Sequence, residues 1–143
     1  MVQEELMDSR LNSIILSLRI AFGLTAFLAG LDKFLNLLTS REQYVSPLAL
    51  DLLPLSAGAL MRVAGVIEMI AGIAVLSGLT RLGGYVIAGW LTAIALSLVF
   101  SGRYFDVAVR DLVMALGALT LARLSEVRAE NPQAVPSLRT HTA

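Results

Sequence analysis

The sequence predicts an all-α integral membrane protein, an antiparallel up-down four-helix bundle with both termini on the same side of the membrane. Of its 143 residues, 57% are hydrophobic and 15% are charged, whereas soluble domains are about 45–50% apolar and about 25% charged. A domain of ~150 residues buries only about 70% of its unfolded surface, so a bilayer must cover the remaining apolar surface. Four apolar segments are long enough to be helices that cross it, and short connections join antiparallel neighbours.

The first span is predicted at residues 11–38. The polar segment before it lacks the positively charged start of a signal peptide, so we expect this helix to be retained. Small residues on one face allow another helix to approach closely, and basic residues on that face then meet protein instead of lipid. At 100° per residue, one narrow stripe holds two basic and three small residues: Arg19, Gly23, Ala26, Gly30 and Lys33.

The second span is predicted at residues 57–76, and it carries two charges inside an apolar run, Arg62 and Glu68. Glycine recurs every seven residues in this span, which predicts one close-packing face between the two charges. The glycines are Gly58, Gly65 and Gly72. Ser77 and Gly78 then break the helix and begin a very short connection.

The third span is predicted at residues 82–102, a stretch without one charged residue. Its length matches the ~20 residues needed to cross a hydrocarbon core of ~30 Å. Trp90 lies in the middle of the span, and we interpret it as a packing residue. Two pairs of small residues at a spacing of four predict close helix contacts: Gly84 with Ala88, and Gly89 with Ala93.

The fourth span is predicted at residues 105–124. It must begin near residue 105, because residues 112–122 alone would reach only ~16 Å at 1.5 Å per residue. A helix that begins there and crosses the membrane places Arg110 and Asp111 in the outer part of the membrane. A stripe of alanines continues the Asp111 side of this helix: Ala115, Ala118 and Ala122.

Residues 1–124 form one predicted membrane domain. Between the first two spans, residues 39–56 combine two prolines with five leucines, so we expect them to lie at the membrane interface as a lid. A loose connector is the alternative. Residues 125–143 contain Pro132, Pro136 and scattered charges, and we expect a disordered tail.

The intramembrane charges are the candidate functional site. A carboxylate in hydrocarbon costs roughly 2.5–3.5 kcal/mol on insertion scales, so Glu68 is expected to face inward and to have a partner. At 1.5 Å per residue, Arg19 and Glu68 lie at about the same depth in the membrane, and this favours an ion pair between them. Toward the opposite side, three acids and three bases lie at similar depth: Asp32, Lys33, Arg62, Asp106, Arg110 and Asp111.

Three interpretations of these charges remain open. Buried ion pairs fix which helix meets which without adding stability. Alternatively, the layer lines a polar cavity under the lid, where Arg62 and Lys33 bind an anionic or carbonyl headgroup and Glu68 at the floor accepts a proton. The third interpretation is a surface for a partner subunit.

Composition excludes several other classes of site. The chain has no cysteine, and its single histidine, His141, lies in the predicted tail. The sequence therefore offers no ligand set for haem, an iron–sulfur cluster, thiol chemistry or a cysteine metal site. Its formal net charge is zero and no basic face with interleaved aromatics is present, so nucleic acid is not an expected partner.

Two stretches resemble the DoxX-like family of small membrane proteins: LRIAFGLTAFLAGLDKF, and VIEMIAGIAVLSGLTR around Glu68. The resemblance covers the first two thirds of the chain well and the last helix more loosely. One departure is Ala29, where many relatives carry a histidine, and this weakens a proton-relay role carried over from the family. The matching positions are Arg19, Gly23, Gly30, Lys33, Glu68, Gly72, Gly78, Thr80 and Arg81.

The resemblance implies a four-helix membrane bundle linked to thiosulfate:quinone oxidoreductase subunits and to redox-stress membrane complexes. We therefore expect a non-catalytic accessory or anchoring subunit of a membrane redox system that binds a quinone or a lipid headgroup in the charged pocket. A quinone is the only cofactor in this expectation. Two alternatives stay open: a small proton-coupled transporter with Arg19, Glu68 and Asp111 as its relay, and an assembly factor that acts through helix contacts.

We expect the protein in the bacterial inner membrane, among its lipids, with a partner redox subunit or a second copy of the chain. An even number of spans puts both termini on one side, and the positive-inside rule favours the cytoplasm for them. The arginines near the spans on that side are Arg10, Arg81, Arg123 and Arg128, against Lys33, Arg41 and Arg103 on the other.

Overall fold

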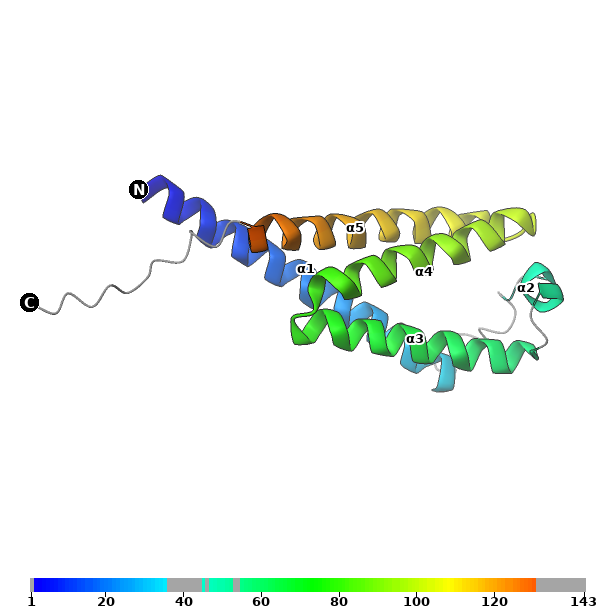
Figure 1. Cartoon of the computed structure of the whole chain (residues 1–143). Helices are drawn as coiled ribbons and strands as arrows, with labels where there is room; N and C mark the ends of the chain where they lie inside the picture. The colour runs from blue at the N-terminus through cyan, green and yellow to red at the C-terminus, as the bar shows by residue number, and fades with distance from the viewer. Residues whose placement is uncertain (1, 36–44, 46, 53–54, 131–143) are drawn as a thin grey trace, which may run out of the picture.

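The computed structural model describes residues 2–35, 45, 47–52 and 55–130 (Figure 1), and every regular element in these ranges is a helix. The all-α class predicted from the sequence is therefore confirmed for the described residues. The helices, in chain order, are α1 (Val2–Leu35), α2 (Pro47–Leu52), α3 (Ala57–Ser77), α4 (Thr80–Phe100) and α5 (Phe105–Glu130).

Three helices are long and apolar enough to cross a membrane: Leu6–Leu35 within α1, then α3 and α4. The predicted fourth span coincides with α5, which is 26 residues long. Charged residues bound its apolar stretch at Asp111 and at Arg123, so composition alone does not identify α5 as a span.

Several predicted boundaries differ from the helices. The third span was placed at residues 82–102, but α4 is Thr80–Phe100, and α3 includes Ser77, where a break in the helix was expected. The first span was placed from residue 11, but α1 begins at Val2 and includes the polar start of the chain. Helix α5 continues to Glu130, six residues into the predicted tail. Arg128, in this added part of α5, forms an ion pair with Asp8 of α1, with 3.1 Å between Nη1 and Oδ1. Within the predicted loop 39–56, α2 is a short helix, and residues 36–44 and 131–143 lie outside the described ranges.

Glycines on facing sides of α1 and α3 bring the two backbones together. A Cβ atom on Gly30 would lie 2.5 Å from the carbonyl oxygen of Gly65, and one on Gly72 would lie 2.7 Å from that of Gly23. Real Cβ atoms do not approach backbone that closely, so these positions require glycine. The predicted close-packing faces of the first two spans are confirmed at Gly23, Gly30, Gly65 and Gly72, where they pack against each other.

Helices α3 and α4 form a hairpin around Gly78. This residue has φ of 106°, in the left-handed region that glycine adopts without strain, and its N–H donates to the carbonyl of Val75. Next to the connection, Gly83 on α4 packs on α3, where its Cβ would lie 3.0 Å from the nitrogen of Val75. The two helices are thus in contact near Gly78.

Helices α4 and α5 form a second hairpin and run side by side (Figure 1). Gly84 faces Ala118 and Ala122, so the first predicted small-residue pair of this span packs on the predicted alanine stripe. The second pair does not meet a helix in the described chain: a Cβ on Gly89 would have no heavy atom within 4 Å, and Ala93 is exposed.

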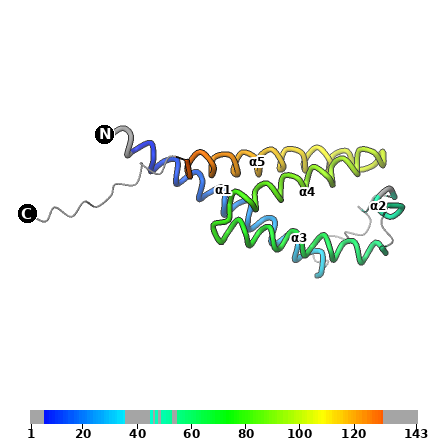
Figure 2. Tube along the Cα trace, viewed as in Figure 1, coloured from blue at the N-terminus to red at the C-terminus, as the bar shows by residue number. Residues whose placement is uncertain are grey.

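The core lies where the two hairpins and α1 meet. Val75, Leu121 and Ile87 are buried there, and Phe22 of α1 packs against them with its ring over Gly117 of α5. From this core toward the end of the molecule that carries α2, α3 and α4 diverge, as the trace in Figure 2 shows. The start of α1 and the end of α5 lie together at the opposite end, joined by the Asp8 to Arg128 ion pair.

Candidate functional site

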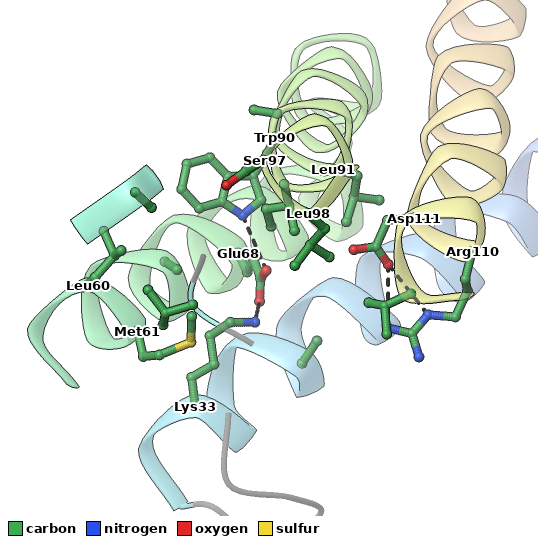
Figure 3. A pocket seen from close by; sticks show the side chains of 17 residues that line it. Lys33, Leu60, Met61, Glu68, Trp90, Leu91, Ser97, Leu98, Arg110 and Asp111 are labelled. Carbon is green, nitrogen blue, oxygen red and sulfur yellow. Dashed lines mark hydrogen bonds and ion pairs between the residues drawn. The ribbon is translucent and has the colours of Figure 1, made fainter. Parts of the chain in front are cut away.

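A cavity of about 420 Å³ lies between the diverging ends of α3 and α4, at the end of the molecule that carries α2, and Figure 3 shows the side chains that line it. Its volume is within the range of small-molecule sites, about 300–1,000 Å³. Helices α1, α2, α3, α4 and α5 all contribute to its wall. The residues that line it are Ala29, Lys33, Val45, Ala49, Leu60, Met61, Ala64, Glu68, Trp90, Leu91, Ala93, Ile94, Ser97, Leu98, Val107, Arg110 and Asp111.

Glu68 is held from two sides at this cavity. Lys33 Nζ lies 2.5 Å from Glu68 Oε2, and Trp90 Nε1 donates to Glu68 Oε1 at 3.2 Å (Figure 3). The side chains of Lys33 and Glu68 are each only 9% exposed. A buried pair repays the desolvation of its two charges only with good geometry and further hydrogen bonds, and Trp90 supplies such a bond.

The glycine contact between α1 and α3 places this ion pair. A Cβ on Gly65 would lie 3.2 Å from Cβ of Lys33, so the base of the lysine side chain lies directly against α3. Glu68 follows Gly65 by three residues, which puts both on the same face of the helix. Glu68 is about 14 Å along α3 from Ser77, near the middle of a 21-residue span.

A second acid and base come from α5. Arg110 Nε and Nη2 each lie 3.4 Å from Asp111 Oδ1. Asp111 is 8% exposed, whereas the Arg110 side chain is 65% exposed, so the carboxylate faces the cavity wall and the guanidinium reaches outward. At these distances the contact is a weak hydrogen bond, so Asp111 keeps most of its capacity to accept one from a ligand.

The charges around the cavity balance. Lys33 and Arg110 are basic, Glu68 and Asp111 are acidic, and Ser97 and the indole N–H of Trp90 are the neutral polar groups in the wall. The other lining residues are apolar. The site therefore offers donors and acceptors at one polar patch within an apolar cavity, without a net charge to attract an ion.

The sequence of residues 14–101, more than half of the chain, matches the profile of the family described as DoxX. The chain belongs to the DoxX family. Together with its three apolar helices, this makes it a membrane protein. No protein of curated function and no solved structure matches it. The matched range contains Lys33, Glu68 and Trp90, while Arg110 and Asp111 of this DoxX protein follow it in α5.

The predicted ion pair between Arg19 and Glu68 is wrong. Arg19 Nη2 donates to the carbonyl of Leu76 at 2.9 Å and Nε to that of Val75 at 3.3 Å, so it caps the C-terminal end of α3. The carbonyls at a helix end are unsatisfied and carry the negative end of the dipole, which favours a cation there. The transporter relay through Arg19, Glu68 and Asp111 is therefore not assembled in this DoxX protein.

Four of the eight predicted site residues line the cavity: Lys33, Glu68, Arg110 and Asp111. Arg62 does not, although Met61 beside it does. It is exposed on the outer face of α3, so its expected role at the pocket is corrected, and Arg110 takes the place of the second base. Asp106 is also exposed, in the first turn of α5, where an acid complements the helix dipole.

Asp32 is buried on α1 beside Lys33 and does not line the cavity.

The residue that the sequence interpretation missed is Trp90, which was expected only to pack. A tryptophan in an apolar span carries one N–H that needs an acceptor, and Glu68 was an available intramembrane acceptor. Among the described residues, no group of three acidic or histidine side chains is arranged to hold a metal ion.

Proposed function

We propose that this DoxX family protein binds the neutral headgroup of a quinone in the cavity between α3 and α4, as a non-catalytic accessory or anchoring subunit of a membrane redox system. The observation that carries the proposal is the polar patch of Lys33, Glu68, Trp90 and Asp111 within an apolar cavity of about 420 Å³. A quinone combines the same two features, a ring with polar oxygens and an apolar tail.

Charge balance favours a quinone over an anionic lipid headgroup. Lys33 is already paired with Glu68, and Arg110 with Asp111, so the cavity has no spare positive charge. An anion placed there would face two carboxylates and would lose its hydration. A neutral ring would lose much less hydration free energy on entering the cavity. The apolar wall would contribute roughly 25 cal/mol for each Å² of apolar ligand surface that it covers.

The polar groups suit both redox forms of such a ring. A quinone carbonyl accepts hydrogen bonds, which the Lys33 ammonium supplies, because it has three N–H donors and uses one of them on Glu68. A quinol hydroxyl also donates, and Asp111 and Glu68 are acceptors on the same cavity. The ring of Trp90 adds an aromatic wall against which a quinone ring stacks.

The proposed role is binding and not electron transfer by the chain itself. With no cysteine and its single histidine at position 141, the chain offers no ligands for haem or an iron–sulfur cluster. Electrons for the bound ring would come from a partner redox subunit, which the proposal includes.

The proposal further places the protein in a bacterial inner membrane as a four-span bundle, with α5 as the fourth span and both termini in the cytoplasm. Proximity of the chain ends, seen in the Asp8 to Arg128 pair, supports an even number of spans. Arg110 and Asp111 partly neutralise each other, which lowers the cost of placing the start of α5 in the membrane. Arg10, Arg81, Arg123 and Arg128 favour the cytoplasm for the end of the molecule that holds the termini.

Trp90 makes the proposal directly testable, because it is the only tryptophan in the chain and it lies on the cavity. A short-chain ubiquinone titrated into the detergent-purified protein is expected to quench its fluorescence with saturation. Glu68→Gln and Asp111→Asn should each weaken binding about 10-fold or more, the usual scale for a lost hydrogen bond to a charged group. Asp106→Asn, which removes an exposed carboxylate from the same helix as Asp111, is the matched control and should bind like the wild type.

A second variant separates loss of binding from loss of folding. Ala93 is exposed and lines the cavity, so Ala93→Phe adds bulk to the cavity without displacing core residues. It is expected to abolish saturable quenching while the protein unfolds at the wild-type temperature. Linear, unsaturable quenching by the quinone, the same in the wild type and in Ala93→Phe, would overturn the proposal.

A further inference from the structure

A second polar cluster lies at the opposite end of the molecule from the cavity, across the seam between α4 and α5. Glu126 is its centre: Arg81 Nε lies 2.8 Å from Oε1, Tyr85 donates its hydroxyl to Oε2 at 3.0 Å, and Arg123 Nη1 lies 3.8 Å from Oε2. One carboxylate thus orients two arginines and a tyrosine from two helices.

This cluster has positive charge to spare. Two guanidinium groups face a single carboxylate, so the net charge is positive, in contrast to the balanced cavity. The side chains of Arg81 and Arg123 are 68% and 71% exposed, whereas Glu126 is 17% exposed. Arg81 pairs with Glu126 through Nε, and the exposure of its side chain leaves the rest of the guanidinium open to the surroundings. Helix α4 also begins here, without a side-chain cap, so its dipole adds partial positive charge.

The position of the cluster fits the membrane surface. Arg81 is the second residue of α4, one of the apolar spans, and Arg123 closes the apolar stretch of α5. Tyr85 lies one turn deeper, and tyrosine is enriched at headgroup depth. Charged donors and an aromatic hydroxyl are thereby placed where the phosphates of one leaflet lie.

Below the cluster, the outer surface of α4 and α5 is apolar and open. Gly89 follows Tyr85 by four residues, and no heavy atom would lie within 4 Å of a Cβ there. Leu119 precedes Arg123 by four residues and is partly exposed. Residues four apart lie on one helix face, so Gly89 continues the face of Tyr85 on α4, and Leu119 continues the face of Arg123 on α5, toward the membrane interior.

We propose that Arg81 and Arg123, oriented by Glu126, bind the phosphate of an anionic phospholipid whose acyl chains lie along the α4–α5 seam. The phosphate meets two largely exposed guanidinium groups, and its charge offsets the excess positive charge. The acyl chains cover the open apolar strip at Gly89. This site is separate from the proposed quinone cavity and does not depend on it.

The test uses full-length protein in mild detergent with phosphatidylglycerol, phosphatidylcholine or inorganic phosphate added, read by native mass spectrometry. Phosphatidylglycerol is expected to remain bound at about one per chain, and phosphatidylcholine to be lost. Arg81→Gln with Arg123→Gln should lower retention of phosphatidylglycerol at least ~10-fold, since each basic residue near the surface contributes measurably to anionic lipid binding. Arg81→Lys with Arg123→Lys keeps both charges and should retain most of the lipid.

The matched control is Arg62→Gln with Arg103→Gln, which removes two exposed arginines from the end of the molecule that holds the cavity. It should bind phosphatidylglycerol like the wild type. Equal losses in the two double variants would overturn the proposal, because binding would then depend only on total charge. It would also be overturned if phosphatidylcholine were retained as well as phosphatidylglycerol, or if inorganic phosphate bound as well as the lipid.

Discussion

Lys33 of α1 and Glu68 of α3 form an ion pair with 2.5 Å between Nζ and Oε2, and each side chain is only 9% exposed. The pair joins the two helices whose backbones already touch at Gly30 and Gly65. The pair therefore has two roles. It fixes α1 against α3, and its carboxylate also accepts the hydrogen bond that holds Trp90 at the cavity wall.

The first prediction concerns the energy of this pair. Lys33→Met alone leaves the Glu68 carboxylate buried without its cation, and breaking a buried pair in this way costs about 3–5 kcal/mol. Lys33→Met combined with Glu68→Leu removes both charges and is expected to recover most of that loss. The measurement is the free energy of unfolding in detergent for the two single variants and the double variant. Additive losses would show that the two side chains do not stabilise each other.

The second prediction concerns the contact between α1 and α3. Gly30→Ala places a Cβ 2.5 Å from the carbonyl of Gly65, so the backbones must separate, and overpacking of this kind typically costs about 1–3 kcal/mol. Gly89→Ala is the matched control, because its Cβ meets no heavy atom, and it should stabilise the helix by roughly 0.5–1 kcal/mol. Thermal unfolding in detergent compares them. Two variants that shift in the same direction would contradict the glycine contact.

The third prediction concerns Arg19, which caps the end of α3 and does not line the cavity. Arg19→Gln loses charged hydrogen bonds to the carbonyls of Val75 and Leu76, and we expect it to destabilise the protein by about 1.5–3 kcal/mol. Quinone binding, measured by Trp90 fluorescence, should stay unchanged, because Arg19 does not line the cavity. Arg62→Gln, at an exposed position, should change stability by no more than ~0.5 kcal/mol. A loss of quinone affinity in folded Arg19→Gln would reinstate a link between Arg19 and Glu68.

The sequence was sufficient to predict the four long helices and the glycine contacts between α1 and α3, and to single out Glu68, but not the short helix α2 or the start of α1. Apolar periodicity and small residues at fixed spacing are local properties, so Gly30, Gly65 and Gly84 could be assigned to contacts before the structure. Glu68 could be singled out because an acid in an apolar span needs a partner.

The partner of Glu68 could not be read from depth alone, because depth was counted from the ends of predicted spans. The structure shows the register instead: Gly23 faces Gly72 and Gly30 faces Gly65. Counting four residues outward from the first of these contacts places Arg19 opposite Leu76, whose carbonyl it binds. Antiparallel alignment of the two seven-residue glycine repeats allows two registers, because the second span has three glycines and the first has two, so the sequence alone does not select the observed one.

The last prediction decides whether α5 crosses the membrane. The chain has no cysteine, so single cysteines introduced at Ser9, Arg103 and Glu130 report their own side of the membrane to an impermeant thiol reagent. With four spans, Ser9→Cys and Glu130→Cys react from the cytoplasmic face, while Arg103→Cys reacts from the periplasmic face. If Glu130→Cys instead reacts from the same face as Arg103→Cys, α5 lies outside the hydrocarbon core and the three apolar helices are the only spans among the described residues. That result would also place Asp111 at the surface, where it would no longer close the cavity from the membrane.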